Sequence, residues 1–154
     1  MLRRTILTSL LLLPLGSTVR AQAPAKPRAA PGQVHVKVSG FRNERGQVFV
    51  ALWRSEKAFP GTPPKGTPSA VAKIVKGVAE TSFRDVPPGV FAVSVFHDED
   101  GDSELKTNFI GIPKEGIGFS RDARARFGPP SWDDAKLKLE PGEVEQVKIT
   151  MLYY

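Results

Sequence analysis

Alternating hydrophobic and polar residues predict the first two strands of this chain. Residues 33–39 alternate valines with polar side chains, and this period of two predicts a strand with one buried face. Residues 47–55 are apolar on both faces, as expected of a central or covered strand. The turn residues 43–46 between them predict that the two strands pair as a hairpin.

The middle of the chain continues the strand pattern. Residues 70–77 and 78–86 predict two short strands that meet at a glycine, with a helix over 70–76 as the alternative. A Pro-Pro-Gly turn precedes the run 90–97, in which the odd-numbered residues, ending at His97, share one face.

Two further alternating segments close the chain, at residues 135–139 and 144–153. Strands of this length, separated by turns, predict an all-β fold: a single antiparallel β-sandwich of about seven strands over residues 33–154. Residues 99–133 have no sustained period, and we expect one long, ordered loop there, because compact domains rarely hold a structureless loop of that length.

The predicted loop is rich in apolar residues, which we expect to fold over one sheet face as a satellite core. An exposed aromatic platform for a sugar or a partner protein is the alternative, with Trp132 the first candidate for exposure. The residues concerned are Phe109, Ile110, Ile112, Ile117, Phe119, Phe127 and Trp132.

The N-terminus resembles a secretory signal. Residues 1–23 combine two early arginines, a short apolar run and an Ala-Gln-Ala end, the pattern of a cleaved signal peptide. Residues 24–32 are rich in Pro and Ala and predict a disordered lead-in. The signal carries three arginines and no acid, so the net charge of +6 becomes +3 after cleavage. With no cysteine in the chain, these features predict an exported protein, periplasmic or extracellular, without disulfides.

Five carboxylates crowd into residues 98–104, directly after a predicted strand. Such a cluster repels itself unless a cation neutralises it, and alternating Asp residues can supply the oxygen ligands that Ca²⁺ prefers. The candidate ligands are Asp98, Asp100, Asp102 and Glu104.

The spacing matches an EF-hand loop only in part. With Asp98 as position one, the glycine, Gly101, falls at position four instead of six, and position twelve is Phe109 instead of a glutamate. Lys106 stands where a further acid would strengthen the site, and its ammonium can replace part of a metal's charge. A solvated acidic turn without metal is the alternative interpretation.

His97 precedes this cluster. It is a candidate ligand-binding residue or general base, and beside Asp98 it raises the alternative of a metal-assisted hydrolase. A structural role at the end of the apolar face is the simpler interpretation. Ser120 lacks the G-x-S-x-G context of a nucleophile.

Arg121, Arg124 and Arg126 form a small basic group near Trp132. These four residues are candidate ligand-binding residues, because arginines can hold a phosphate or carboxylate of an envelope polymer. The alternative is a solvated surface or a set of partners for the acidic turn. No nucleic-acid motif is present.

Several segments carry a family resemblance. "GQVFVALW" at 46–53, "GIPKEGIGFS" at 111–120 and "GPPSWDDA" at 128–135 resemble the secreted bacterial family catalogued as domain-of-unknown-function family 2141. The resemblance implies an exported one-domain β-sandwich without an assigned activity. The segment 85–93 is also similar to hairpins of transthyretin-like and carboxypeptidase-regulatory-like sandwiches, which usually bind or support other groups.

The resembled family's acidic turn usually reads HDENGNGKLD. In this chain Asp100 and Asp102 replace the two asparagines and keep oxygen ligands, Ser103 replaces a glycine, and Lys106 replaces the final acid. The change at Lys106 removes one oxygen ligand of the family pattern, so the resemblance leaves a bound Ca²⁺ at this turn in doubt.

Together these features predict a non-catalytic, exported module, stabilised by a divalent cation such as Ca²⁺, that binds a protein or glycan of the cell envelope. The hydrolase centred on His97 is one alternative. A structural subunit of an envelope assembly is the other.

Overall fold

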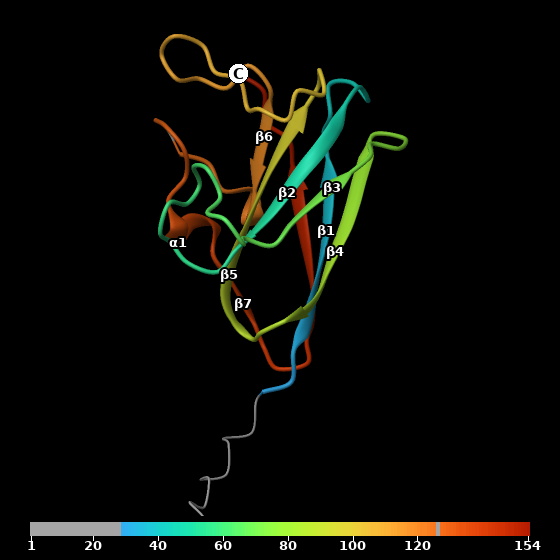
Figure 1. Ribbon diagram of the computed structural model, residues 1–154, viewed down its shortest axis with the longest axis vertical. Helices are drawn as coiled ribbons and strands as arrows, with labels where there is room; N and C mark the ends of the chain where they lie inside the picture. Colours follow the sequence, from blue (N-terminus) through green and yellow to red (C-terminus); the bar gives the residue numbers. More distant parts are fainter. Residues whose placement is uncertain (1–28, 126) are drawn as a thin grey trace, which may run out of the picture.

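The computed structural model describes residues 29–125 and 127–154 as an all-β domain (Figure 1). The predicted signal peptide, most of the lead-in and Arg126 lie outside these residues. The elements in chain order are β1 (Gly32–Ser39), β2 (Gln47–Trp53), β3 (Ser69–Ala72), β4 (Val78–Val86), β5 (Gly89–Asp98), β6 (Gly116–Phe119), the 3-10 helix η1 (Ser120–Asp122), α1 (Trp132–Ala135), β7 (Leu137–Leu139) and β8 (Val144–Thr150).

The strands form two open sheets. One has the order β4-β1-β8, and the other has the order β3-β2-β5-β6, with β7 also paired to β5. All pairs are antiparallel except β1 with β8, which run parallel. The predicted all-β class is confirmed. The sandwich of about seven antiparallel strands is not confirmed in detail, since the described residues form eight strands and one sheet is mixed.

The first two strands of the chain belong to different sheets. β1 pairs with β4 and β8, whereas β2 pairs with β3 and β5. The predicted hairpin of residues 33–39 and 47–55 is thus wrong. Each segment has a row of apolar side chains. Because the two segments lie in opposite sheets, their apolar rows face each other and are both buried in the core between the sheets.

The main core lies between the two sheets. The predicted alternation is confirmed in β1, where Val34, Val36 and Val38 are at most 1% exposed. In β5, the predicted face that ends at His97 is buried along its length. The core is completed by apolar residues of β2, β4, β7 and β8.

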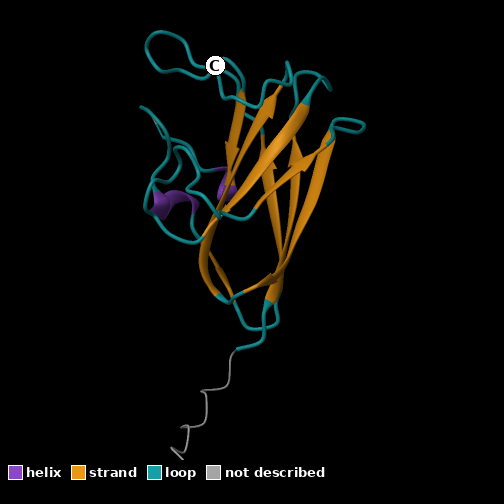
Figure 2. Cartoon of the chain, in the orientation of Figure 1, coloured by secondary structure: helices purple, strands orange, loops and turns teal. Residues whose placement is uncertain are grey.

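A second apolar cluster covers the outer face of β2 and β5. Trp53, Ala51 and Ala92 point to this side and pack with residues of β6, η1 and α1. Phe59 joins Trp53 and Trp132 through edge-to-face ring contacts with centroids 5.4 and 5.5 Å apart. Figure 2 shows both short helices on this one side of the strands. This covering explains why residues 47–55 are apolar on both faces.

The predicted loop 99–133 contains more regular structure than expected. β6 lies inside it and pairs with β5, and its four residues are all buried. A Cβ at Gly116 or Gly118 would overlap side chains of Tyr153 or Ile149, so these glycines permit the close packing of β6.

The satellite core predicted for this loop is correct only in part. Ile117 and Phe119 are buried, and Trp132 is half-buried. In contrast, Phe109 is 98% exposed, and Ile110, Ile112 and Phe127 are also exposed. The apolar residues of β6 pair with a sheet, whereas those of the turn at 108–111 project from it.

Ser120 closes a gap in the edge of β5. β6 pairs with residues 94–97 of β5 and β7 pairs with residues 89–91, so Val93 lies between the two partners. The buried Ser120 hydroxyl accepts a hydrogen bond from the N–H of Val93 at 3.0 Å and donates one to the carbonyl of Ala135 at 2.6 Å. One side chain thus satisfies two buried backbone groups.

We predict that Ser120→Ala lowers the free energy of unfolding by about 1–3 kcal/mol, because both backbone groups lose their buried partner. Denaturant unfolding measures the effect. Ser82→Ala, which removes an exposed hydroxyl paired with His35, is the control, with a change below about 0.5 kcal/mol. Equal stability of the two variants would contradict this role of Ser120.

Candidate functional site

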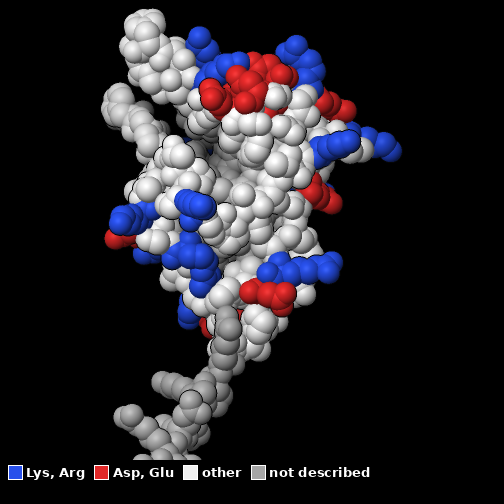
Figure 3. Space-filling model, in the orientation of Figure 1, with Lys and Arg blue, Asp and Glu red and all other residues white. Residues whose placement is uncertain are grey.

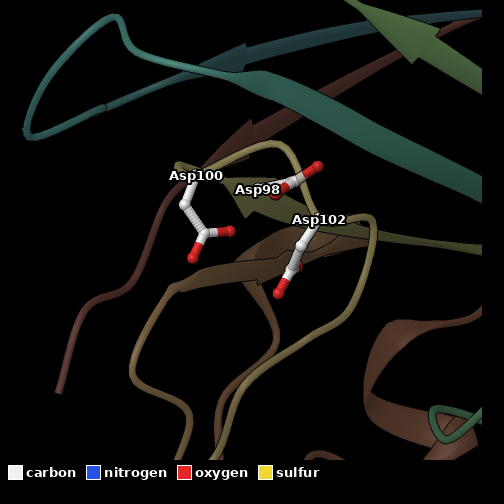
Figure 4. Close-up of side chains that lie close together, drawn as sticks. All are labelled: Asp98, Asp100 and Asp102. Atoms are coloured by element: carbon white, nitrogen blue, oxygen red, sulfur yellow. The ribbon is translucent and has the colours of Figure 1, made fainter.

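The candidate site is the acidic turn, residues 98–104, where the chain leaves β5. Carboxylate oxygens of Asp98, Asp100 and Asp102 lie within 4.8 Å of one another (Figure 4). Glu104 is exposed and lies outside this group. In Figure 3 the largest group of acidic atoms lies at the upper end of the molecule, with basic atoms beside it.

Asp98 organises the backbone of the turn. It is fully buried, and its carboxylate accepts hydrogen bonds from the Gln47 amide at 2.9 Å and the N–H of Gly101 at 2.8 Å. The N–H of Ser103 donates a third at 3.2 Å. Gly101 and Ser103 both have positive φ, which folds the chain back around this carboxylate. A buried carboxylate needs such donors, so Asp98 has a structural role whatever else the turn binds.

Lys106 neutralises the two outer acids of the turn. Its ammonium contacts Asp100 and lies 2.7 Å from Oδ2 of Asp102. The hydrogen bond from Lys106 lowers the pKa of Asp102, and the two carboxylates raise the pKa of Lys106. Lys106 therefore brings a cationic group to the carboxylates that were predicted to hold a metal.

The three converging carboxylates of the turn already have hydrogen-bond or ion-pair partners within the protein. Ca²⁺ takes six to eight oxygens, whereas Asp98 is already committed to three donors and Lys106 contacts Asp100 and Asp102. A metal ion at the two outer carboxylates would compete with the Lys106 ammonium for their negative charge. The geometry therefore favours a turn whose acids are neutralised by Lys106 over a turn that holds Ca²⁺.

Glu99 forms a separate ion pair on the other side of the turn. Arg42 contacts it, the Asn43 amide donates to it at 2.7 Å, and Arg45 lies 3.6 Å away. Burial opposes ionisation of Glu99, but the hydrogen bonds from Arg42 and Asn43 outweigh it, so the pKa of Glu99 is lowered. The acidic turn thus has arginine partners in the β1–β2 connection, which sequence reasoning missed.

Glu115 holds together the two ends of the loop that follows the turn. It is 5% exposed, and its carboxylate accepts from the N–H of Glu99 at 3.0 Å and the N–H of Lys106 at 3.2 Å. Sequence reasoning missed Glu115 as well. An acid next to a glycine carries no signal of burial until β6 pairs with β5.

His97 is fully buried and has a hydrogen-bond partner at each ring nitrogen. Nε2 lies 2.7 Å from the carbonyl oxygen of Arg45, so it donates there, and Nδ1 accepts from the Tyr153 hydroxyl at 2.8 Å. The ring also packs edge-on against Phe41 at 5.2 Å. Both nitrogens therefore have partners inside the protein, which favours the simpler interpretation of His97 over ligand binding or base catalysis.

The other candidate ligand-binding residues lie elsewhere, around η1 and α1. Arg121 and Arg124 are exposed, and Arg121 donates weakly to the carbonyl of Asp133 at 3.4 Å. Trp132 starts α1 and packs on Phe59. The turn's basic partners are Lys106, Arg42 and Arg45, so the alternative that Arg121 and Arg124 balance it is not supported.

The family model described as an uncharacterised protein conserved in bacteria (DUF2141) matches residues 36–147. No curated protein and no solved structure matches the chain. The similarity to transthyretin-like sandwiches therefore stays a prediction. In the part of the chain that the structure describes, no helix has the length and apolar character to cross a membrane.

We predict that Lys106→Asp strengthens Ca²⁺ binding at least about tenfold over the wild type, because it removes a competing ammonium and adds a carboxylate ligand. Calorimetric titration of chelator-treated protein measures the affinity. Lys65→Asp makes the same charge change in another loop and serves as the control. Equal affinities of wild type and Lys106→Asp would contradict the role of Lys106.

We also predict that Gly46→Ala destabilises the domain by at least about 1 kcal/mol more than Gly66→Ala. Both glycines have positive φ, so the backbone cost is shared. A Cβ at Gly46 would overlap the carbonyl of Asp98, whereas nothing lies within 4 Å of a Cβ at Gly66. Thermal or denaturant unfolding compares the two, and equal losses would show that this close approach is unimportant.

Proposed function

The chain belongs to the DUF2141 family of uncharacterised bacterial proteins, and we propose that it is an exported, non-catalytic module that binds a protein of the cell envelope. The signal-like residues 1–23 support export. The non-catalytic interpretation is supported by the internal hydrogen bonds of both His97 ring nitrogens.

One observation carries the proposal: large apolar side chains stand exposed on a well-ordered turn. Phe109 is 98% exposed and Ile110 is 64% exposed, and they occupy the tip of the turn 108–111. Such apolar groups at a tip gain free energy only when another surface covers them. A protein pocket fits this convex tip better than a glycan, because it can enclose both side chains.

The turn is held in one conformation before any partner arrives. The Asn108 carbonyl accepts from the N–H of Gly111 at 3.0 Å, and its side chain accepts from the N–H groups of Ile110 at 3.0 Å and Ile112 at 2.9 Å. A preorganised tip loses little conformational entropy on binding, which favours affinity.

The acidic turn supports this tip from below. Glu115 joins the base of the loop to Glu99, and Lys106 ties the same base to Asp100 and Asp102. In this proposal the role of the acids is to hold the loop in place. Ca²⁺ would take over from Lys106 only where its concentration allows displacement.

The proposal predicts that Phe109→Ser weakens capture of an envelope protein at least about tenfold, as expected for the loss of a central apolar anchor. Purified wild type and variant are immobilised, and the captured partner is quantified from envelope extracts of the native host.

Val71→Ser, which changes a 55% exposed valine on β3, is the control and should keep full capture. If Phe109→Ser and Val71→Ser retain equal amounts of the same partner, the tip is not the binding surface. A partner bound equally well by Phe109→Ser would favour a structural subunit that uses another face.

A further inference from the structure

A second surface feature lies at the opposite end of β2 from the acidic turn. Where β2 ends, residues 52–55 and the loop at 64–68 enclose an open hollow of about 270 Å³. Pockets for drug-sized ligands begin near this size, at roughly 300 Å³, so the hollow suits one small chemical group.

The hollow is lined by three cationic side chains, Arg54, Lys57 and Lys65. Of its ten lining residues, all within the described part of the chain, none is acidic. Within residues 29–125 and 127–154, none of the three forms an ion pair, whereas Lys37, Lys136 and Lys138 each pair with a carboxylate. Three like charges around one hollow repel one another, and an anion between them would relieve that repulsion.

The walls of the hollow are held by hydrogen bonds. The Arg54 guanidinium donates to the carbonyl of Pro88 at 3.1 Å, which fixes its position. The N–H of Leu52 donates to the carbonyl of Pro68 at 2.9 Å, and the N–H of Thr67 donates to that of Pro64 at 3.0 Å. The loop therefore keeps its shape without a ligand.

Ser55 adds a neutral donor to the cations. Its Oγ accepts from the N–H of Lys57 at 3.1 Å, which leaves the hydroxyl proton for another acceptor. Cationic groups and a hydroxyl together match the oxygens of a phosphate or carboxylate, to which charge-assisted hydrogen bonds are strong.

We propose that this hollow binds an anionic molecule that carries at least two negative charges, either on a phosphate group or on two or more carboxylate groups. The proposal is independent of the apolar tip, because the two surfaces lie at opposite ends of β2. A ligand here would neutralise Arg54, Lys57 and Lys65 without contacting Phe109.

Titration calorimetry of the mature full chain at low salt tests the proposal, with pyrophosphate as the phosphate probe and trigalacturonate as the carboxylate probe. We expect one probe to bind at a single site. Lys57→Gln/Lys65→Gln should weaken that binding at least about tenfold, because two of three charges are lost.

Lys114→Gln/Lys148→Gln changes the net charge equally at other exposed lysines and should bind within about twofold of wild type. Phe109→Ser should bind the probe as the wild type does, so this test does not depend on whether the turn 108–111 binds a protein. Circular dichroism confirms that each variant is folded.

Two outcomes would overturn the proposal. One is the absence of measurable binding of either probe to the wild type at millimolar concentration. The other is an equal loss in both double variants, which would indicate attraction by net charge alone.

Discussion

The two central strands, β2 and β5, are apolar on both faces, and the rest of the structure follows from the need to cover them. The sheet β4-β1-β8 covers one face and forms the main core. On the other face, the loop after β2, together with β6, η1 and α1, packs around Trp53 and Ala92. Ser120 then joins these covering elements to β5 by satisfying the N–H of Val93. The elements that cover the outer face are thus held in place by their packing on β2 and β5.

Electrostatic balance at the end of β5 shows how the chain tolerates five neighbouring acids. Asp98 is satisfied by donors from the backbone and Gln47, Lys106 balances Asp100 and Asp102, and Arg42 balances Glu99. Four of the five acids thus have local partners within hydrogen-bonding reach, and the fifth, Glu104, is exposed. These pairings give the loop 104–115 a rigid base, on which the exposed Phe109 and Ile110 are presented.

The two surfaces proposed for binding differ in their physics. The tip at 108–111 is convex and apolar, and it would gain free energy by being covered. The hollow at the end of β2 is concave and cationic, and it would gain by charge neutralisation. Because one surface depends on apolar area and the other on charge, salt should weaken binding at the hollow far more than binding at the tip.

The sequence alone determined the strand-forming segments other than β6, the buried positions of β1 and β5, and the position of the acidic turn, because side-chain alternation and local charge density are properties of neighbouring residues. It also identified Lys106 as a possible substitute for a metal's charge. Tertiary structure alone decided that β1 and β2 belong to different sheets, that β6 pairs within a segment without period, and that Glu115 and Arg42 meet the acidic turn. These contacts join residues far apart in the chain, and their energy comes from burial and charge pairing that no local pattern records.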